Sequence, residues 1–475
     1  MNDEREQFFN EDPYEAVRKR YENMLKNQNY QFFDVDEFEE IIDYYLQNNE
    51  LSKAEKAIYM AFTQHPGSVA IQIKKVQYLI DSGRPFQALK ILHKLKEQEP
   101  GNEDIYLMMA FAHNQLGNVK EAVKQFDFAV QIAEEGKDEL LHNIGNTFQN
   151  NMMYKLAIKY LRQAYELRPD NLSIIYDLAF CHEKNNDFKK SVAFYNKYLD
   201  IDPYSEMAWF KLAGVYEKME KYDKALEAYD YALAIDESFS LVYLNKASVY
   251  IDMGNFTEAI RMYLDFVRLE PDYADAYCSI GACYEEMCDF EKAIYYYRKA
   301  IHLDKNYAEP WYYIGCLKMM QKKYAESLYF LNKAVKLDPE NEEYWHTLAR
   351  ANMYTGSFTA ALRCFEKSIE YDPYNMQVWI ECASLLMDQQ QLKKAARLME
   401  NALEYHPDAA EVYYYLSACY FGMGEKTQGG EYYKTALTHN VLIEPTMSRL
   451  FESLYDKKIT KKIFSAYKKS KKNDM

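Results

Sequence analysis

The sequence predicts an all-α chain that folds as an α-α superhelical solenoid of about twelve 34-residue helix-turn-helix repeats with helical caps. Three observations lead to this fold class. The chain has 475 residues, above the length at which a single hydrophobic core stops growing. It contains only 15 Gly and 12 Pro, so few residues interrupt helices. Eight of the prolines recur at intervals of 34 or 68 residues, with one interval of 69, and a fixed period of this length is typical of repeat proteins.

Small residues keep the same interval through the whole chain, apart from one residue inserted near 134–137. They are Ala54, Ala88, Ala122, Ala157, Ser191, Ala225, Ala259, Ala293, Ser327, Ala361, Ala395 and Gly429. A small residue at one place in every repeat indicates that two helices touch closely there. The four tryptophans follow the same interval, each six residues after a proline or its equivalent place: Trp209, Trp311, Trp345 and Trp379.

Each repeat reads as two amphipathic helices, as the segment 206–239 illustrates. Apolar residues at helical spacing form one face in its first half: Met207, Trp209, Leu212, Val215 and Tyr216. The segment KMEKYD interrupts this pattern, and a second face begins at Ala225. An Asp-Pro pair ends most second helices, because Pro disfavours a helical conformation in the residue before it. A single hairpin cannot bury its apolar face alone, so stacking of neighbouring hairpins has to form the core.

The periodicity divides the chain into an N-terminal cap, a repeat array and a C-terminal cap. The N-terminal capping segment is acidic and covers 1–34, with a charged helix expected over 14–29. The predicted repeats are 35–68, 69–102, 103–137 (with the inserted residue), 138–171, 172–205, 206–239, 240–273, 274–307, 308–341, 342–375, 376–409 and 410–443. The C-terminal cap, 444–475, is expected to hold a helix over 446–455 after Pro445 and a Lys-rich helix over 459–469.

Two copies of the repeat show a family pattern most clearly. One copy reads Trp209, Leu212, Ala213, Tyr216, Ala225, Tyr229 and Ala232, and another reads Tyr277, Ile280, Gly281, Tyr284, Ala293, Tyr297 and Ala300. This order of residues resembles the tetratricopeptide repeat (TPR) signature, and the resemblance covers about 35–443. Single repeats depart from it: Lys246 stands in place of Leu, and His113, His182, Lys318 and Asn352 stand in place of Tyr. The chain thereby resembles bacterial cytoplasmic TPR scaffold proteins.

The resemblance implies a concave groove lined by repeat positions 2, 5, 9, 12 and 13 of the first helices. Apolar and aromatic residues dominate these positions in the last four repeats. The candidate peptide-binding residues are Tyr312, Met319, Met320, Arg350, Met353, Tyr354, Ile380, Met387, Tyr414 and Phe421. Methionine adapts to different apolar partners, so this stripe could receive a helix or an extended peptide. The alternative is that neighbouring first helices pack there and Met fills the gaps.

Two other sets of groove positions are polar. The repeats at 103–137 and 138–171 carry amides that could pair with a peptide backbone: Asn114, Gln115, His142, Asn146, Gln149 and Asn150. Position 2 is acidic in seven repeats and forms an acidic lip, here represented by Asp275, Glu309, Glu343 and Glu411. Such a lip favours ligands with Lys or Arg. The alternative for both sets is an ordinary solvated helix face.

Composition excludes several classes of function. The net charge of −16 disfavours nucleic acid as a general ligand, because phosphate binding needs a basic surface. No run of 18 apolar residues occurs, and no apolar segment follows the N-terminus, so we expect neither an integral membrane segment nor Sec-type export. The eight cysteines lack metal-ligand spacing and read as reduced thiols of a cytoplasmic protein. No catalytic motif appears, so we expect no enzymatic activity, no cofactor and no metal.

The function predicted from these observations is a protein-protein interaction scaffold that binds a peptide or helix of a partner in its concave groove. The partner is expected to present basic or apolar segments. Two alternatives remain. Residues 1–50 carry 14 acidic and five basic side chains, whereas 457–475 carry eight Lys and one Asp, so copies could assemble end to end. The Lys-rich tail could instead attach the protein to an anionic surface.

Overall fold

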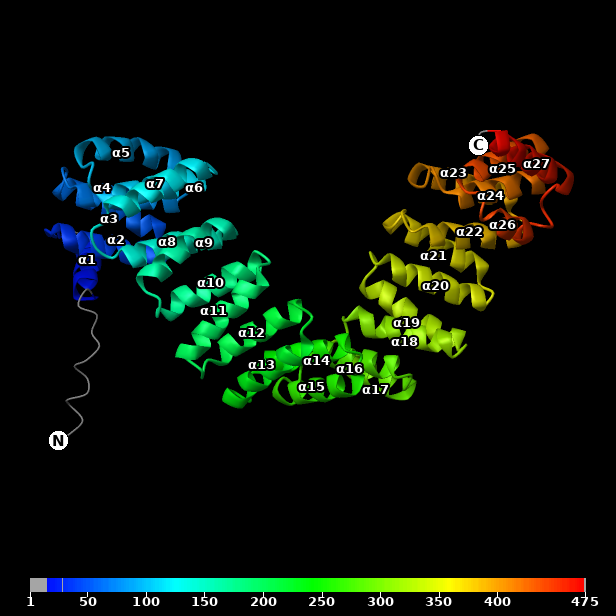
Figure 1. Cartoon of the computed structure of the whole chain (residues 1–475), viewed down its shortest axis with the longest axis horizontal. Coiled ribbons are helices and arrows are strands. Elements are labelled where there is room, and N and C mark those ends of the chain that lie inside the picture. The colour runs from blue at the N-terminus through cyan, green and yellow to red at the C-terminus, as the bar shows by residue number, and fades with distance from the viewer. Residues whose placement is uncertain (1–14, 28, 474–475) are drawn as a thin grey trace. The chain divides into compact units, whose positions relative to one another are not determined.

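The computed structural model describes residues 15–27 and 29–473, and side chains up to 469 (Figure 1). Over these residues it contains 27 helices and no strand. The chain divides into two compact units, Met1–Ala228 and Tyr229–Met475, which are called the N-terminal unit and the C-terminal unit here. Helix α13 (Tyr222–Ile235) contains the boundary.

The N-terminal unit holds one capping helix and five complete helical hairpins. Its helices are α1 (Glu15–Asn27), α2 (Val35–Gln47), α3 (Leu51–Gln64), α4 (Val69–Asp81), α5 (Pro85–Gln98), α6 (Glu103–Gln115), α7 (Val119–Ile132), α8 (Lys137–Asn150), α9 (Tyr154–Leu167), α10 (Leu172–Lys184), α11 (Phe188–Ile201) and α12 (Glu206–Lys218). The predicted helix 14–29 corresponds to α1, and Tyr14 and Gln28 lie outside the described residues.

The C-terminal unit holds six complete hairpins and two capping helices. Its helices are α14 (Ser240–Asp252), α15 (Phe256–Leu269), α16 (Ala274–Glu286), α17 (Phe290–Leu303), α18 (Ala308–Met320), α19 (Tyr324–Leu337), α20 (Glu342–Tyr354), α21 (Phe358–Tyr371), α22 (Met376–Asp388), α23 (Leu392–Tyr405), α24 (Ala410–Gly422), α25 (Lys426–His439), α26 (Glu444–Leu450) and α27 (Lys457–Asn473). The helix expected over 446–455 is therefore shorter and begins earlier, with Pro445 in its first turn. The Lys-rich helix is longer than expected.

The turn between the two helices of every hairpin contains one residue in the left-handed backbone conformation, with positive φ. It is always residue 15 of the repeat. Five hairpins use Gly (Gly83, Gly117, Gly254, Gly356, Gly424), and seven use another residue (Asn49, Met152, Asn186, Glu220, Cys288, Lys322, Gln390). The backbone N–H groups that follow bond back to the end of the first helix, as Gln391 does to the Leu386 carbonyl at 2.8 Å. This arrangement ends the first helix and turns the chain within three residues.

The predicted column of small residues lies between the two helices of each hairpin, and all twelve residues are buried. The first helix approaches closely there. A Cβ atom on Gly281 would lie 2.6 Å from the buried ring of Tyr297, and one on Gly315 would lie 2.7 Å from Leu331. The helices of one hairpin therefore pack at a distance that larger side chains would not allow.

Aromatic residues at repeat position 4 explain the six-residue spacing between Pro and Trp. The indole N–H of Trp345 donates to the carbonyl of Pro339 at 2.8 Å, and Trp209 and Trp379 make the same bond to Pro203 and Pro373. In these three repeats the ring ties the first helix to the loop before it. The position-4 residue Trp311 has Lys305 at the equivalent loop place, and its indole N–H has no hydrogen-bond partner among the described residues.

Capping helices cover both ends of the described chain. Tyr21 of α1 is buried against the rings of Phe33 and Phe38. At the other end, Ile459 and Ile463 of α27 pack on α25 beside Gly430. The lysines of α27 up to residue 469 face outward and are exposed. Lys471 and Lys472 lie outside the residues whose side chains the structure describes.

Candidate functional site

Hydrogen bonds tie successive first helices together along one row of side chains. Residue 5 of one repeat meets residue 6 of the next in three places. His142 Nε2 lies 2.6 Å from Asp177 Oδ2, and His346 Nε2 lies 3.0 Å from Glu381 Oε2. Tyr312 and Thr347 share a hydrogen bond of 3.3 Å between their hydroxyls. These contacts fix the spacing of the first helices, on which the candidate groove residues lie.

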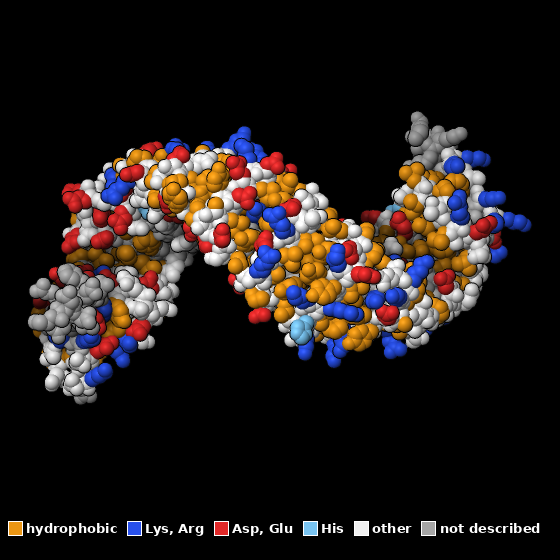
Figure 2. All heavy atoms as spheres, turned by 90° about the horizontal axis from the view of Figure 1, so that it is seen from below, with side chains coloured by type: hydrophobic (Ala, Val, Ile, Leu, Met, Phe, Trp, Pro, Cys, Tyr) orange, Lys and Arg blue, Asp and Glu red, His pale blue; other side chains and the backbone are white. Residues whose placement is uncertain are grey.

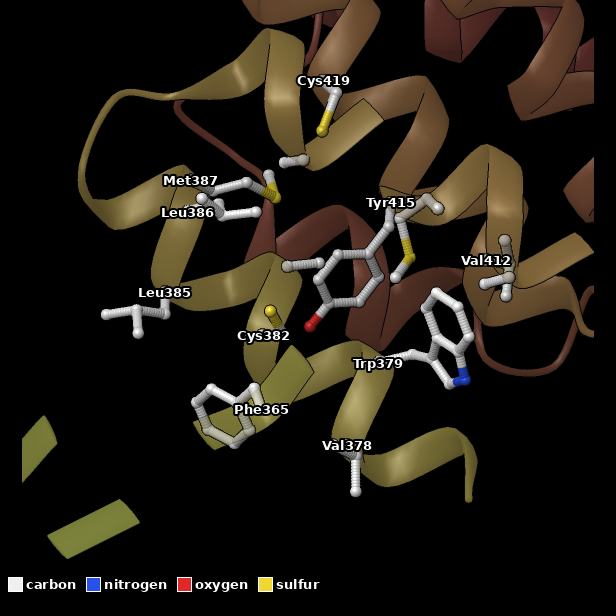
Figure 3. Packing of buried hydrophobic residues seen from close by; sticks show 14 of the residues in the cluster. Phe365, Val378, Trp379, Cys382, Leu385, Leu386, Met387, Val412, Tyr415 and Cys419 are labelled. Atoms are coloured by element: carbon white, nitrogen blue, oxygen red, sulfur yellow. The ribbon is translucent and has the colours of Figure 1, made fainter. Parts of the chain in front are cut away.

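The structure divides the ten candidate peptide-binding residues by exposure. Tyr312, Met387, Tyr414 and Phe421 are buried. Met319, Met353 and Ile380 are half-buried, whereas Met320, Arg350 and Tyr354 are exposed. In Figure 3, Leu386 and Met387 point toward α24, and Leu385 points the opposite way. The four buried residues therefore pack between helices, which is the alternative that the sequence left open for this stripe.

The C-terminal cap explains the burial in the last repeat. The ring of Phe421 meets Tyr455 edge-on with ring centres 5.7 Å apart. Tyr455 also donates its hydroxyl to the carbonyl of Tyr414 at 3.1 Å, and Tyr414 donates to the carbonyl of Asn440 at 3.3 Å. The segment after α25 thus covers the groove positions of α24. The helical spacing of the repeat could not reveal this contact, because the cap lies outside the repeat register.

A cavity of about 470 Å³ opens on α20, the start of α21 and α22. It brings together four of the predicted residues: Arg350, Met353, Tyr354 and Ile380. Seven further residues line it: Phe358, Gln377, Glu381, Ser384, Leu385, Asp388 and Gln389. Sequence reasoning restricted to five repeat positions missed most of these. Phe358 belongs to the second helix of its hairpin, and Glu381 occupies position 6. We call this space the α20–α22 cavity.

Charged groups form one wall of the α20–α22 cavity. Burial alone would raise the pKa of Glu381, but hydrogen bonds from His346 and Gln377 outweigh burial and lower that pKa. Arg350 adds a long contact, with Nε 4.0 Å from Glu381 Oε2. Asp388 is exposed at the rim and makes no ion pair with any described residue. The cavity thus combines an apolar floor of Met353, Tyr354 and Ile380 with an ionised carboxylate wall.

Of the six polar candidates, only two line a common cavity. Asn114 and Gln115 line a cavity of about 540 Å³ together with Gln77, Ile80, Asp81, Met108, Phe111 and Asn151. The other four candidates lie outside it. His142 bonds Asp177, Gln149 accepts from the Cys181 thiol at 3.0 Å, and Asn150 is exposed. The side-chain oxygens of Asn114 and Asn146 have no hydrogen-bond partner among the described residues.

Tyrosines hold three of the four carboxylates of the acidic lip. The Tyr307 hydroxyl donates to Asp275 at 2.7 Å and also lies 3.0 Å from Glu309. Tyr312 donates to Glu343 at 2.9 Å. Burial and the neighbouring Asp275 carboxylate raise the pKa of Tyr307. These carboxylates therefore connect repeats as well as facing solvent.

Other kinds of site are not found in the part of the chain that the structure describes. No group of three or more His, Cys, Asp or Glu side chains is placed to hold a metal ion there. Across those same residues, no helix is long and apolar enough to cross a membrane.

Family models match most of the repeat array. Models of the tetratricopeptide repeat match 79–133, 241–273, 274–307, 308–341, 342–375 and 386–440. A model of subunit 3 of the anaphase-promoting complex (cyclosome) matches 150–232. No curated protein sequence matches the chain.

Stacked helix-turn-helix repeats whose first helices are linked by hydrogen bonds are typical of one class of protein-interaction scaffold. This chain belongs to the tetratricopeptide repeat family.

Several solved structures resemble parts of the chain. The C-terminal part of a TPR repeat-containing protein from Cytophaga hutchinsonii is 16% identical, with a TM-score of 0.43, covering 49% of this chain and 96% of that one. MamA from Desulfovibrio magneticus RS-1 is 18% identical (TM-score 0.32; 35% and 95% covered). YrrB, described as a TPR protein with an unusual peptide-binding site, is 19% identical (TM-score 0.33; 41% and 97% covered). Structural similarity at these identities and TM-scores supports no conclusion about the function of this chain.

Proposed function

We propose that this protein is a cytoplasmic scaffold that binds a peptide or helix of a partner protein along its first helices, with the α20–α22 cavity as the principal contact. The observation that carries the proposal is the convergence of Arg350, Met353, Tyr354 and Ile380 on one cavity. An apolar floor can receive one or two apolar side chains of a ligand. The role is non-catalytic and requires no cofactor.

The charges of the cavity support a ligand with basic groups. Asp388 is exposed at the rim, and the lowered pKa of Glu381 keeps that carboxylate ionised at neutral pH. The acidic lip of Asp275, Glu309 and Glu343 extends the negative potential along α16, α18 and α20. A Lys or Arg of the ligand would gain from this potential, whereas nucleic acid would be repelled.

The polar cavity of the N-terminal unit offers a second place where a peptide backbone can bind. Asn114 and Gln115 offer donors and acceptors beside Asp81, whose pKa burial raises. Amide side chains can pair with a peptide backbone regardless of its side chains. We assign this cavity a supporting role in peptide binding.

Selection of peptides from a random displayed library on the full chain tests the proposal. We expect the enriched peptides to combine apolar residues with Lys or Arg. Binding of a selected peptide, measured by fluorescence anisotropy, should weaken at least tenfold in Met353→Ser/Tyr354→Ala, because these changes remove the apolar floor without adding charge. Urea unfolding of the variant checks that the fold persists.

Met320→Ser is the matched control. Met320 is 63% exposed and belongs to the predicted stripe, but it does not line the α20–α22 cavity. Its replacement should leave the affinity unchanged. Equal affinity of the wild type and Met353→Ser/Tyr354→Ala for every selected peptide would remove the cavity from the binding site.

A further inference from the structure

Two exposed tyrosines break the pattern of the second helices. Tyr295 of α17 and Tyr329 of α19 occupy residue 22 of successive repeats and are 59% and 57% exposed. The other ten repeats place a charged residue or Ala there: Lys56, Lys90, Lys124, Lys159, Ala193, Glu227, Arg261, Arg363, Arg397 and Glu431. Each ring has aromatic neighbours within the chain, Tyr296 beside Tyr295 and Trp311 beside Tyr329, yet both residues remain more than half exposed. Their exposed apolar area is available for a contact outside the chain.

Basic residues follow each tyrosine on the same helix face. Arg298 and Lys299 lie three and four residues after Tyr295, and Lys333 and Lys336 lie four and seven residues after Tyr329. Residues at these spacings share one face of a helix, and all four basic side chains are exposed. Figure 2 views the molecule from the side on which α15 and α17 lie in Figure 1, and it shows hydrophobic side chains interleaved with Lys and Arg.

The two faces are neighbours. Helix α18 packs against both α17 and α19. Its Trp311 ring lies 6.2 Å from the ring of Tyr329 and 6.0 Å from that of Phe330. A hydrogen bond from Lys318 lowers the pKa of Glu326 on α19, and the charge of Arg298 on α17 adds to this lowering. We call Tyr295, Arg298, Lys299, Tyr329, Lys333 and Lys336 the basic tyrosine surface.

The surface carries positive charge that the described residues leave uncompensated. Residues 290–337 contain nine Lys or Arg and four Asp or Glu, in a chain with a net charge of −16. Lys292 and Lys318 pair with Asp289 and Glu326. In contrast, Arg298, Lys333 and Lys336 make no ion pair with any described residue, and Lys299 lies over the Tyr277 ring at 4.3 Å. The uncompensated charges are available to an anionic partner.

We propose that the basic tyrosine surface is a second docking site, on the second helices rather than the first, and that it binds an acidic peptide segment of a partner protein that carries apolar or aromatic side chains. Carboxylates of such a segment would meet Arg298, Lys299, Lys333 and Lys336, and its apolar side chains would cover Tyr295 and Tyr329. Tyr and Arg, with Trp, are enriched among the residues that carry most of the binding energy at protein interfaces.

A nucleic acid fits this surface less well. A polyanion extends its charge over many residues, but the flanking second helices offer it no net positive charge. Helices α15 and α21 each carry two acidic and two basic residues, and Glu258, Asp265 and Glu370 pair with Arg261, Arg268 and Lys367. The negative charge of the chain as a whole opposes a long polyanion. A peptide of about 15 residues can keep its carboxylates within the two basic helices.

Fluorescence anisotropy with three labelled probes tests the proposal on the full chain. The probes are a 16-residue peptide of alternating Glu and Tyr, the same peptide with Gln in place of Glu, and a 16-nucleotide oligothymidine. We expect the Glu/Tyr peptide to bind at least tenfold more tightly than both others. Its affinity should fall at least tenfold in Tyr295→Ala/Tyr329→Ala and in Arg298→Gln/Lys333→Gln/Lys336→Gln, and it should fall with rising salt.

The matched control is Lys56→Gln/Tyr59→Ala on α3. Both of its residues are exposed on a second helix of the N-terminal unit, and Lys56 occupies residue 22. This variant and the cavity variant Met353→Ser/Tyr354→Ala should bind the Glu/Tyr peptide as the wild type does. Three outcomes would overturn the proposal: no preference for Glu/Tyr over Gln/Tyr, unchanged affinity in both surface variants, or tighter binding of oligothymidine that the same variants abolish. Loss of binding in the cavity variant would likewise place the peptide elsewhere.

Discussion

At the residue scale, the close packing of the hairpins depends on positions where a buried side chain leaves no room for a larger residue on the facing helix. Gly281 of α16 faces the ring of Tyr297 on α17, and the Tyr297 hydroxyl donates to Glu285 at 2.7 Å. The ring is completely buried and held at its far end by this bond. It cannot move aside easily for a new methyl group, so glycine is required at this position by packing rather than by backbone conformation.

Gly281→Ala should therefore destabilise the protein. Alanine gains about 1 kcal/mol in intrinsic helix propensity over glycine. Its Cβ would stand 2.6 Å from two carbons of the Tyr297 ring, and overpacking of a buried contact costs about 1–3 kcal/mol. The urea midpoint of unfolding should fall. Gly214→Ala is the control, because nothing lies within 4 Å of its Cβ, and that change should raise the midpoint. A rise in both variants would contradict the close approach of α16 and α17.

Thiol reactivity gives a second prediction at this scale. Burial raises the pKa of seven of the eight cysteines to about 11 or 12: Cys181, Cys278, Cys283, Cys316, Cys364, Cys382 and Cys419. Cys288 is exposed in the turn between α16 and α17. Because the thiolate is the reactive form, DTNB at pH 8 should modify one cysteine rapidly and the rest only after denaturation. Cys288→Ser should abolish the rapid phase, and a persisting phase would identify a second accessible thiol.

At the element scale, the turn inside each hairpin sets the angle at which the second helix leaves the first. The left-handed conformation of its central residue is the same in all twelve hairpins, although only five use glycine. A non-glycine residue in this conformation costs about 1–2 kcal/mol. The seven other turns therefore hold a strain that the packing of their helices has to overcome.

Replacement of Gln390 by glycine should release part of this strain. Gln390 has a φ of 57° and is exposed, so the change removes no buried contact. We expect Gln390→Gly to stabilise the protein by about 0.5–1 kcal/mol, since glycine regains the conformational cost but loses more chain entropy on folding. The reverse change, Gly356→Gln, should destabilise by a similar amount. Chemical denaturation measures both, and shifts of the same sign would argue against a shared turn conformation.

The C-terminal helix α27 has an apolar side and a basic side. Ile459, Ile463 and Phe464 pack on the core of the last hairpins, and the exposed lysines face outward. A chain that ends at residue 456 should therefore expose apolar surface on α25. We expect a lower unfolding temperature and increased binding of the dye ANS. A chain that ends at 470 is the control, and it should match the wild type. Equal stability of both truncated chains would leave α27 free for attachment to an anionic surface.

At the scale of the whole molecule, the period in the sequence predicted the all-helical repeat fold, because every repeat packs its two helices with similar residues at the same positions. It could not predict which groove positions stay open. Met353 and Met387 occupy the same place in successive repeats, yet one lines a cavity and the other is buried. Exposure depends on contacts outside the repeat, such as that of Tyr455 on Phe421. The spacing of residues along one repeat does not encode these contacts.

The pattern of contacts leads to the last prediction. Within each unit, the substantial helix contacts join helices that are at most two apart in the chain. A local loss of stability can therefore spread only through neighbouring hairpins, so repeat arrays behave as chains of nearest-neighbour interactions. In Gly281→Ala, amide hydrogen exchange should accelerate most in α16 and α17, less in α15 and α18, and not measurably in α2–α7. Uniform acceleration through the chain would mean instead that all repeats unfold as one cooperative body.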